Sequence, residues 1–262
     1  GEARSLNNDN WQRVVRFQDK DSTQHTLLIP YEHFMGEAQE ALRIIANHGL
    51  MPPRQAYKKN VFINYIQDYP IEKRFRSVDR AGWYGNSFVT TNHTYGNGTD
   101  EELLFYSETK DPYSKSGSLE GWQELSQLIE PHSLAVLAFS CAFSGQLVTP
   151  LAIESGGFHI YGISSHGKST ITKAACGIWG KPKDISKSWR TTDNALENDA
   201  ELRNDSFMNL DEIGQSTPKA AADIIYMVTG GQGKVRSSQA GNNRDSKQFN
   251  LMYTSTGEIT LG

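Results

Sequence analysis

Apolar and polar residues alternate differently in the two halves of the chain. Near the start, residues 11–17 and 25–30 have strand-like composition and flank a polar turn, which predicts a β-hairpin. Apolar residues at helical spacing over 37–48 and 58–69 predict two helices. Together with strand-like residues over 75–88, these patterns predict a small α+β domain.

A polar stretch separates the two halves. Residues 92–118 are rich in Asn, Gly, Thr, Ser and Asp, and one apolar island over 103–106 predicts a strand between loops. We therefore expect an N-terminal accessory α+β domain over 1–116 and a second domain over 117–262.

The second half alternates between helix and strand patterns. Ser118 caps a predicted helix, and an apolar helix over 134–143 follows it. Downstream, the predicted elements are a strand at 158–161, a helix to about residue 179, a short strand at 187–191, a helix from the N-cap Asn194 to about Arg203, a strand at 207–212, a helix at 219–228 and a strand at 249–253. Such alternation predicts an α/β fold around a parallel sheet.

The apolar run over 134–153 is about as long as a membrane span. It contains Ser140, Gln146 and Pro150, however, and it leads within a few residues into the predicted strand at 158–161. These features favour a buried helix followed by a turn, and we expect no contact with a membrane.

Composition narrows the possible partners and compartments. The net charge of −4 gives no global sign of nucleic-acid binding, so any such surface must be a local patch. Cys141 and Cys176 form no C-x-x-C motif, and the seven histidines lack metal-ligand spacing. We therefore expect reduced thiols, a cytoplasmic protein and no zinc site.

Residues 162–169 read G-x-x-x-x-G-K-S, the pattern of a phosphate-binding P-loop between a strand and a helix. The two glycines let successive backbone N–H groups point at a phosphate, and the helix N-terminus adds its positive dipole end. Lys168 would reach the β- and γ-phosphates, and Ser169 would ligate Mg²⁺. The predicted nucleotide-binding residues are Gly162, Ser164, Ser165, His166, Gly167, Lys168, Ser169 and Thr170, although His166 has no assignable role.

An acid-bearing strand adds the second part of the predicted site. The apolar run at 207–212 ends in Asp211 and Glu212, about 40 residues after the P-loop, as a Walker B strand does. Asp211 would hold Mg²⁺, and Glu212 would polarise the attacking water. The Asp–Glu pair favours an ATP-hydrolysing motor over a nucleoside kinase or a GTPase, and the sequence has no Asn-Lys-x-Asp motif for guanine. We therefore expect ATP and Mg²⁺ as cofactors.

Two further groups of residues extend the prediction. Ser255 and Thr256 follow the strand pattern at 249–253, where a hydroxyl could sense the γ-phosphate or simply satisfy backbone groups. The glycine-rich loop at 230–247 is basic, and it could contact DNA phosphates or a neighbour's nucleotide, or remain solvated. Its candidate residues are Lys234, Arg236, Arg244 and Lys247.

A second basic cluster lies in the N-terminal half. It consists of Arg54, Lys58, Lys59, Lys73, Arg74, Arg76 and Arg80, mixed with Tyr57, Tyr65, Phe75, Trp83 and Tyr84. Cations and stacking rings together suit a nucleic-acid strand, whereas rings buried in a core would have no such role.

Several motifs together resemble one family. They are DRAGW at 79–83, GSLEGW at 117–122, ESGGFH at 154–159 with the P-loop at 162–170, WRTTDNALE at 189–197, LDEIGQ at 210–215 and STGE at 255–258. Nearly the whole chain is similar to the bacterial "domain of unknown function" family 927 of phages and other mobile elements. The resemblance implies a P-loop NTPase core of the AAA+ or RecA-like type and a helicase-type ATPase, in some cases similar to hexameric replicative helicases.

The sequence departs from the family pattern at its end. In the family, a further strand with an arginine and a helical lid follow the strand at 249–253, whereas this sequence ends at Gly262. We therefore expect a fragment that alone binds ATP weakly and hydrolyses it slowly or not at all. Two functions remain open: an oligomeric, ATP-driven DNA helicase or translocase, and a nucleotide-gated DNA-binding or assembly module.

Overall fold

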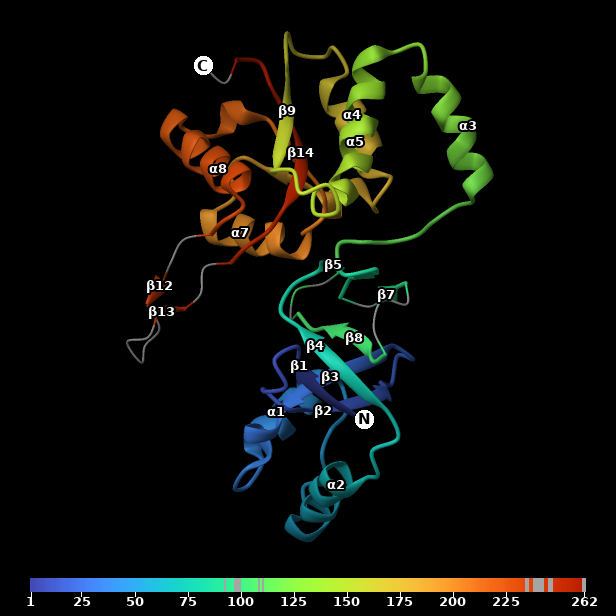
Figure 1. Cartoon of the computed structure of the whole chain (residues 1–262), viewed down its shortest axis with the longest axis vertical. Helices are drawn as coiled ribbons and strands as arrows, with labels where there is room; N and C mark the ends of the chain where they lie inside the picture. The colour runs from blue at the N-terminus through green and yellow to red at the C-terminus, as the bar shows by residue number, and fades with distance from the viewer. Residues whose placement is uncertain are drawn as a thin grey trace. The chain divides into compact units, whose positions relative to one another are not determined.

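The computed structural model of the protein describes residues 1–91, 93–96, 100–107, 109, 111–233, 236–237, 243–244 and 247–260. It divides into two compact units (Figure 1). One unit consists of Gly1–Asp79 and Tyr84–Glu108, and the other of Arg80–Trp83 and Thr109–Gly262. The short segment Arg80–Trp83 therefore belongs with the second unit. The division expected after residue 116 stays a prediction.

The first unit contains a five-stranded mixed sheet. Its strands are β1 (Glu2–Ser5), β2 (Gln12–Gln18), β3 (Gln24–Pro30), β4 (Arg74–Val78) and β8 (Glu102–Phe105), in the spatial order β3-β2-β1-β4-β8. β2 pairs antiparallel with β1 and β3, whereas β1, β4 and β8 run parallel. The predicted hairpin is confirmed as β2 and β3. Of the short strands β5 (Gly82–Tyr84), β6 (Ser87–Val89) and β7 (Thr94–Tyr95), β6 and β7 pair antiparallel.

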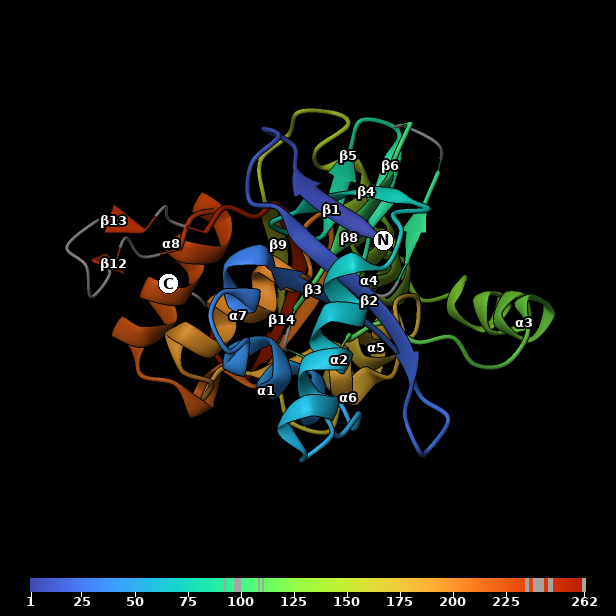
Figure 2. The same ribbon diagram turned by 90° about the horizontal axis from the view of Figure 1, so that it is seen from below.

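Helices cover one face of this sheet (Figure 2). They are η1 (Tyr31–Phe34), α1 (Gln39–Asn47) and α2 (Ala56–Asp68), so the two predicted helices are confirmed with slightly different ends. Leu27 and Ile29 of β3 pack in one buried cluster with Ile45 of α1 and with Ile63 and Ile66 of α2. Each helix thus contributes only one face to the core.

The second unit contains a four-stranded parallel sheet in the order β10-β11-β14-β9. Its elements are α3 (Leu119–Ile129), α4 (Ser133–Ser144), η2 (Gly145–Leu147), β9 (Gly156–Tyr161), α5 (Lys168–Cys176), α6 (Pro182–Ile185), β10 (Ser186–Ser188), α7 (Asp193–Leu202), β11 (Ser206–Asp211), η3 (Ile213–Gln215), α8 (Pro218–Gly230), β12 (Arg236–Ser237), β13 (Asn243–Arg244) and β14 (Leu251–Gly257). The protein is therefore a mixed α/β protein with a parallel sheet, as the sequence predicted.

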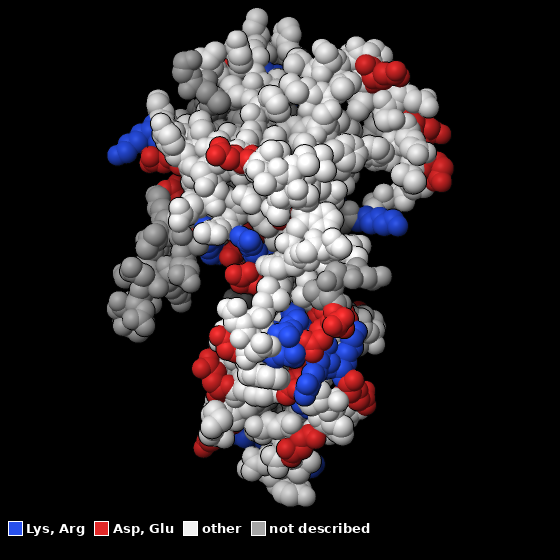
Figure 3. All heavy atoms as spheres, viewed as in Figure 1, with Lys and Arg blue, Asp and Glu red and all other residues white. Residues whose placement is uncertain are grey.

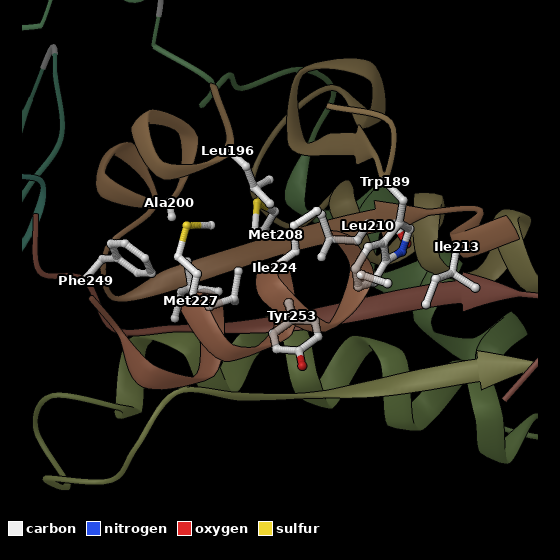
Figure 4. Packing of buried hydrophobic residues seen from close by; sticks show 13 residues of the cluster. Trp189, Leu196, Ala200, Met208, Leu210, Ile213, Ile224, Met227, Phe249 and Tyr253 are labelled. Atoms are coloured by element: carbon white, nitrogen blue, oxygen red, sulfur yellow. The ribbon is translucent and has the colours of Figure 1, made fainter. Parts of the chain in front are cut away.

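The two faces of the parallel sheet carry different helices. On one face, Ile160 of β9 and Phe207 of β11 pack with residues of α4 and α5 such as Ala142 and Ala175. On the other face, Met208 and Leu210 of β11 pack with α7 and α8 (Figure 4). Because successive residues of a strand point to opposite faces, odd and even positions of β11 serve different cores.

The N-cap predicted at Asn194 is wrong, because the N-cap of α7 lies two residues earlier. The N-cap is Thr192, whose backbone is extended and whose hydroxyl accepts a hydrogen bond from the Ala195 N–H at 3.4 Å. This cap leaves Asp193 in the first turn, where the helix dipole favours an acid.

The last strand of the sheet is longer than its apolar pattern predicts. β14 runs to Gly257, so Ser255 and Thr256 lie inside the strand and not beyond it. Its polar side chains find buried partners: the Thr254 hydroxyl donates to Asn209 Oδ1 at 2.9 Å, and the Asn209 amide donates to Ser186 Oγ at 2.8 Å. Across these three strands, hydrogen bonds between polar side chains therefore take the place of apolar packing.

The apolar run that begins at residue 134 forms a short helix that is buried on one face only, because Leu134, Val136 and Phe143 are exposed. α4 ends at Ser144, and a 3-10 turn follows it. Within the described part of the chain, no helix has the length and apolar character that crossing a membrane requires.

Candidate nucleotide-binding site

The predicted P-loop connects the end of β9 to the start of α5. The Gly162 N–H donates to the Gly257 carbonyl at 3.2 Å, which ties the loop to the end of β14. Gly167 has φ +80° immediately before α5, a conformation that residues with a Cβ rarely adopt. Residues 163–167, including Ser164, Ser165 and His166, are exposed. The loop therefore presents its backbone to solvent at the N-terminus of α5.

Lys168, the first residue of α5, is folded back over this loop. Its ammonium donates to the Gly162 carbonyl at 2.8 Å and to the Ile163 carbonyl at 2.7 Å. Two carbonyl oxygens of the loop thus accept hydrogen bonds from the Lys168 ammonium.

Asp211, at the end of β11, contacts three side chains from two other elements, α5 and β14. Its Oδ1 accepts hydrogen bonds from Ser169 Oγ of α5 at 2.9 Å and from Thr256 Oγ1 of β14 at 2.7 Å. Its Oδ2 forms an ion pair with Lys173 Nζ at 2.8 Å. Burial alone would raise the pKa of Asp211, but the Lys173 ammonium and the two hydroxyls outweigh burial and hold this pKa below its ordinary value.

Ser255 and Thr256, which the sequence could not separate, point to opposite faces of the sheet. Thr256 shares the face of Asp211, whereas Ser255 lies opposite Leu210 in the register, on the other face. Ser255 Oγ accepts a hydrogen bond from Trp189 Nε1 at 3.0 Å. It also lies 2.9 Å from His159 Nδ1. Of these two neighbours, Thr256 therefore contacts the Asp211 carboxylate, and Ser255 belongs to a separate network with Trp189 and His159.

Glu212 lies directly after β11 in a left-handed conformation, with φ +61°. Its N–H donates to Thr256 Oγ1 at 3.0 Å, so Thr256 links the two acids. The Glu212 carboxylate accepts from the Gly214 N–H at 3.3 Å and thereby caps the short helix η3. The position of the Glu212 side chain is therefore fixed by the 3-10 helix that follows it.

The model of one family matches residues 1–248, which is most of the chain, and describes the domain as being of unknown function, DUF927. The chain belongs to the DUF927 family. The resemblance inferred from the motifs is thereby confirmed. No curated protein matches the chain.

Solved structures resemble the DUF927 chain at low sequence identity. One is the active helicase Cch of SCCmec type IV, with a TM-score of 0.69 and 15% identity over 100% of this chain and 50% of that chain. The DUF927 chain thus spans about half the length of Cch, and the likeness establishes a shared fold.

Two other likenesses are too distant to support an argument. The C-terminal region of NrS-1 matches with a TM-score of 0.39 and 8% identity over 95% of this chain and 55% of that chain. NtrX from Brucella abortus in complex with ATP matches with a TM-score of 0.26 and 15% identity over 53% of this chain and 36% of that chain.

The DUF927 site includes residues that the sequence analysis missed. Lys173 lies four residues after Ser169 and thus on the same face of α5, a spacing that could have identified it. His159 and Trp189 carried no such signal, because the partner that joins them, Ser255, is distant in sequence.

An apolar cavity of about 520 Å³ lies beside the first turn of α5. It extends from Thr170, next to the P-loop, to the residues that precede α4. Among the residues that line it are Ile129, His132, Leu134, Phe139, Thr170 and Ile171.

The basic loop after α8 is described only in part. Lys234 and the side chains of Arg236 and Arg244 lie outside the described residues, although the backbones of β12 and β13 pair antiparallel. Lys247 forms an ion pair with Glu201 and donates to Asn198 Oδ1 at 3.1 Å, both on α7. A role for these four residues in DNA contact stays a prediction.

Proposed function

We propose that this DUF927 chain is the ATP-binding and ATP-hydrolysing module of a DNA helicase or translocase that acts in phage or mobile-element DNA replication. One observation carries the proposal: Asp211, at the carboxyl end of β11, accepts hydrogen bonds from Ser169 of the P-loop and from Thr256 of the adjacent parallel strand β14. Open α/β sheets bind ligands at this edge. In this proposal the parallel sheet is the core of an AAA+ or RecA-like P-loop NTPase.

The loop supplies the groups that a triphosphate needs. The N-terminal turn of α5 leaves backbone N–H groups without helical partners, and the helix dipole favours an anion there. Lys168 would exchange its two carbonyl partners for the β- and γ-phosphates, a charge-assisted contact that is stronger than the one it leaves.

The residues around Asp211 fit Mg²⁺. They offer one carboxylate and two hydroxyl oxygens, from Asp211, Ser169 and Thr256, and hard divalent cations prefer oxygen ligands. When bound, Mg²⁺ would neutralise charge on the phosphates. Ser169 and Asp211 would hold it, and Lys173 would lose its contact with Asp211 Oδ2.

Hydrolysis would depend on Glu212 and Thr256. Turned away from the Gly214 N–H, the Glu212 carboxylate would accept a proton from the attacking water. Thr256 holds the Glu212 backbone in place through its hydroxyl. The base of the nucleotide would enter the apolar cavity beside Thr170, where ring surfaces replace water.

Self-association belongs to the same proposal. The P-loop residues 163–167 are exposed, so a bound triphosphate would have one side open to a neighbouring copy. A neighbour that supplies an arginine could complete the site in a hexamer, and the fold shared with the active helicase Cch supports a motor.

DNA-stimulated ATP hydrolysis tests this proposal. We expect single- or double-stranded DNA to increase turnover by the protein, and we expect both Lys168→Ala and Glu212→Gln to abolish the increase. Lys183→Ala and Glu154→Gln are the matched controls, because both residues are exposed and lie outside the site. No stimulation by either DNA would count against a motor.

A nucleotide-gated DNA-binding or assembly module is the second candidate. The observation that favours it is that the Glu212 carboxylate caps η3 and does not point freely into the site. The variant Glu212→Gln separates the two candidates. A gated binder would keep its ATP-dependent DNA binding in this variant, whereas a motor would lose turnover and trap ATP.

A further inference from the structure

Within the first unit, the residues of the predicted basic and aromatic cluster fall into two groups, whereas Arg80 and Trp83 belong to the second unit. The cations on the sheet are paired with acids: Arg76 with Glu101, Lys73 with Glu102, and Arg74 with Glu2. Figure 3 shows positive and negative side chains interleaved over this region. The ring among them, Phe75, is buried. This group is therefore an ion-paired part of the fold.

The group on α2 is different. Tyr57 is 79% exposed and Tyr65 is 61% exposed, with the half-exposed Val61 between them. Successive members of this set are spaced four residues apart, so the three lie on one face of the helix at intervals of about 6 Å along its axis. The opposite face packs into the core through Ile63 and Ile66. The stripe of Tyr57, Val61 and Tyr65 is therefore at least half exposed at each residue, although the Tyr65 ring packs edge-on against Tyr69 with 5.3 Å between the ring centroids.

Positive charge accompanies this stripe. Residues 51–67 contain Arg54, Lys58 and Lys59 and no acid, although the whole chain has a net charge of −4. No ion pair involves these three cations in the described part of the chain. The nearest acid in sequence is Asp68, the last residue of α2. The positive charge is therefore concentrated at the N-terminal end of the stripe, near Tyr57.

We propose that the stripe, with Arg54 and Lys58, binds single-stranded nucleic acid. Exposed rings stack on unpaired bases without regard to sequence, and the neighbouring cations contact the phosphates. A duplex hides the faces of its bases within its own stack, so the rings favour a single strand. The proposed function is needed only to identify the strand as DNA; the surface itself is independent of the ATP site.

Binding of a labelled single-stranded oligonucleotide to the full chain without nucleotide tests this inference by fluorescence anisotropy. We expect Tyr57→Ala and Tyr65→Ala to weaken binding by roughly 5- to 150-fold each, because one stacked base is lost each time. Lys58→Ala should weaken binding less and should reduce the salt dependence by about 0.7 in log–log slope. Tyr57→Phe should bind as the wild type does, because it keeps the ring.

Matched controls come from the same chain. Tyr226 of α8 is 78% exposed, so Tyr226→Ala removes an equally accessible tyrosine elsewhere. Lys73→Ala removes a lysine of the first unit that is already paired with Glu102. Both should bind the oligonucleotide as the wild type does. Because the altered side chains are exposed, circular dichroism should show unchanged folding.

Several outcomes would overturn the inference. The first is a double variant without Tyr57 and Tyr65 that binds the oligonucleotide as tightly as the wild type. The second is a Tyr226→Ala variant that loses as much affinity as the α2 variants. The third is a wild-type chain that does not bind the oligonucleotide. Self-association that depends on Tyr57 while oligonucleotide binding does not would assign the stripe to a protein contact. Oligonucleotide binding that depends on α2 would uphold this inference whether or not the chain binds or hydrolyses ATP, so the inference and the proposed function can fail separately.

Discussion

Asp211 accepts hydrogen bonds from Ser169 and Thr256 and pairs with Lys173, so one carboxylate connects the P-loop helix to two strands. These contacts favour the ionised form and lower its pKa. A carboxyl whose pKa is lower in the folded protein stabilises the fold above its unfolded pKa, and this stabilisation disappears as the pH falls through the folded pKa.

The pH dependence of stability should therefore change in Asp211→Asn. At pH 7 the variant should be less stable than the wild type. The difference should shrink as the pH falls below the ordinary Asp pKa of about 3.9 and vanish once Asp211 is protonated in both states. Urea unfolding of both proteins at a series of pH values measures this difference in the free energy of unfolding. A difference that is constant down to low pH would contradict the assigned contacts.

Thr256 and Ser255 are neighbours in sequence but belong to different networks. Thr256→Val should reduce ATP turnover by about 10- to 100-fold, since the two acids lose the hydroxyl that links them. Thr256→Ser should restore turnover.

Ser255→Ala should act on stability instead. It leaves His159 and Trp189 without a shared partner, and it should cost about 1–3 kcal/mol while the ATP affinity stays unchanged. Thermal unfolding and ATP titration of both variants separate the two effects. Equal effects of Ser255→Ala and Thr256→Val on turnover would contradict the assignment to opposite faces.

Among the elements, β11 connects two hydrogen-bonded polar sites at its opposite ends. Asp211 lies at one end, and Asn204 and Asp205 precede the other. The Asn204 amide donates to the Ala81 carbonyl at 2.8 Å, and the Asp205 carboxylate accepts from the Trp83 N–H at 2.9 Å. These contacts hold the segment Arg80–Trp83 on the second unit.

Gly82 should be irreplaceable in this segment. It has φ +105°, and a Cβ would lie 2.3 Å from Asn204 Nδ2 and 2.4 Å from Asp205 Oδ2. Gly82→Ala should therefore destabilise the protein by about 2–4 kcal/mol in thermal or urea unfolding. Gly156→Ala is the control, because its Cβ would meet no atom within 4 Å. A loss below about 1 kcal/mol for Gly82→Ala would contradict the described packing.

Elements with local signals could be predicted from the sequence, and elements that depend on distant partners could not. The hairpin, the P-loop and the acid-bearing strand each carry their own periodicity or motif. β1 is short and mostly polar, and only pairing with β2 and β4 makes it a strand. The end of β14 was missed because Thr254, Ser255 and Thr256 are polar yet fully buried.

At the scale of the whole molecule, the chain spans about half the length of Cch. We propose that its ATP site works between copies of the chain. Specific ATPase activity should therefore rise with protein concentration, in step with self-association measured by sedimentation. Turnover that is robust and independent of concentration would contradict a shared site.

ATP binding at the P-loop is the central claim, and equilibrium titration with ATP tests it most directly. In the presence of Mg²⁺, calorimetry should show saturable binding of one ATP per chain. Lys168→Ala should weaken binding by roughly 10- to 100-fold, because a charge-assisted phosphate contact is lost, and Lys183→Ala should leave it unchanged. Equal ATP affinity in the wild type and Lys168→Ala, or no binding to either, would contradict the account.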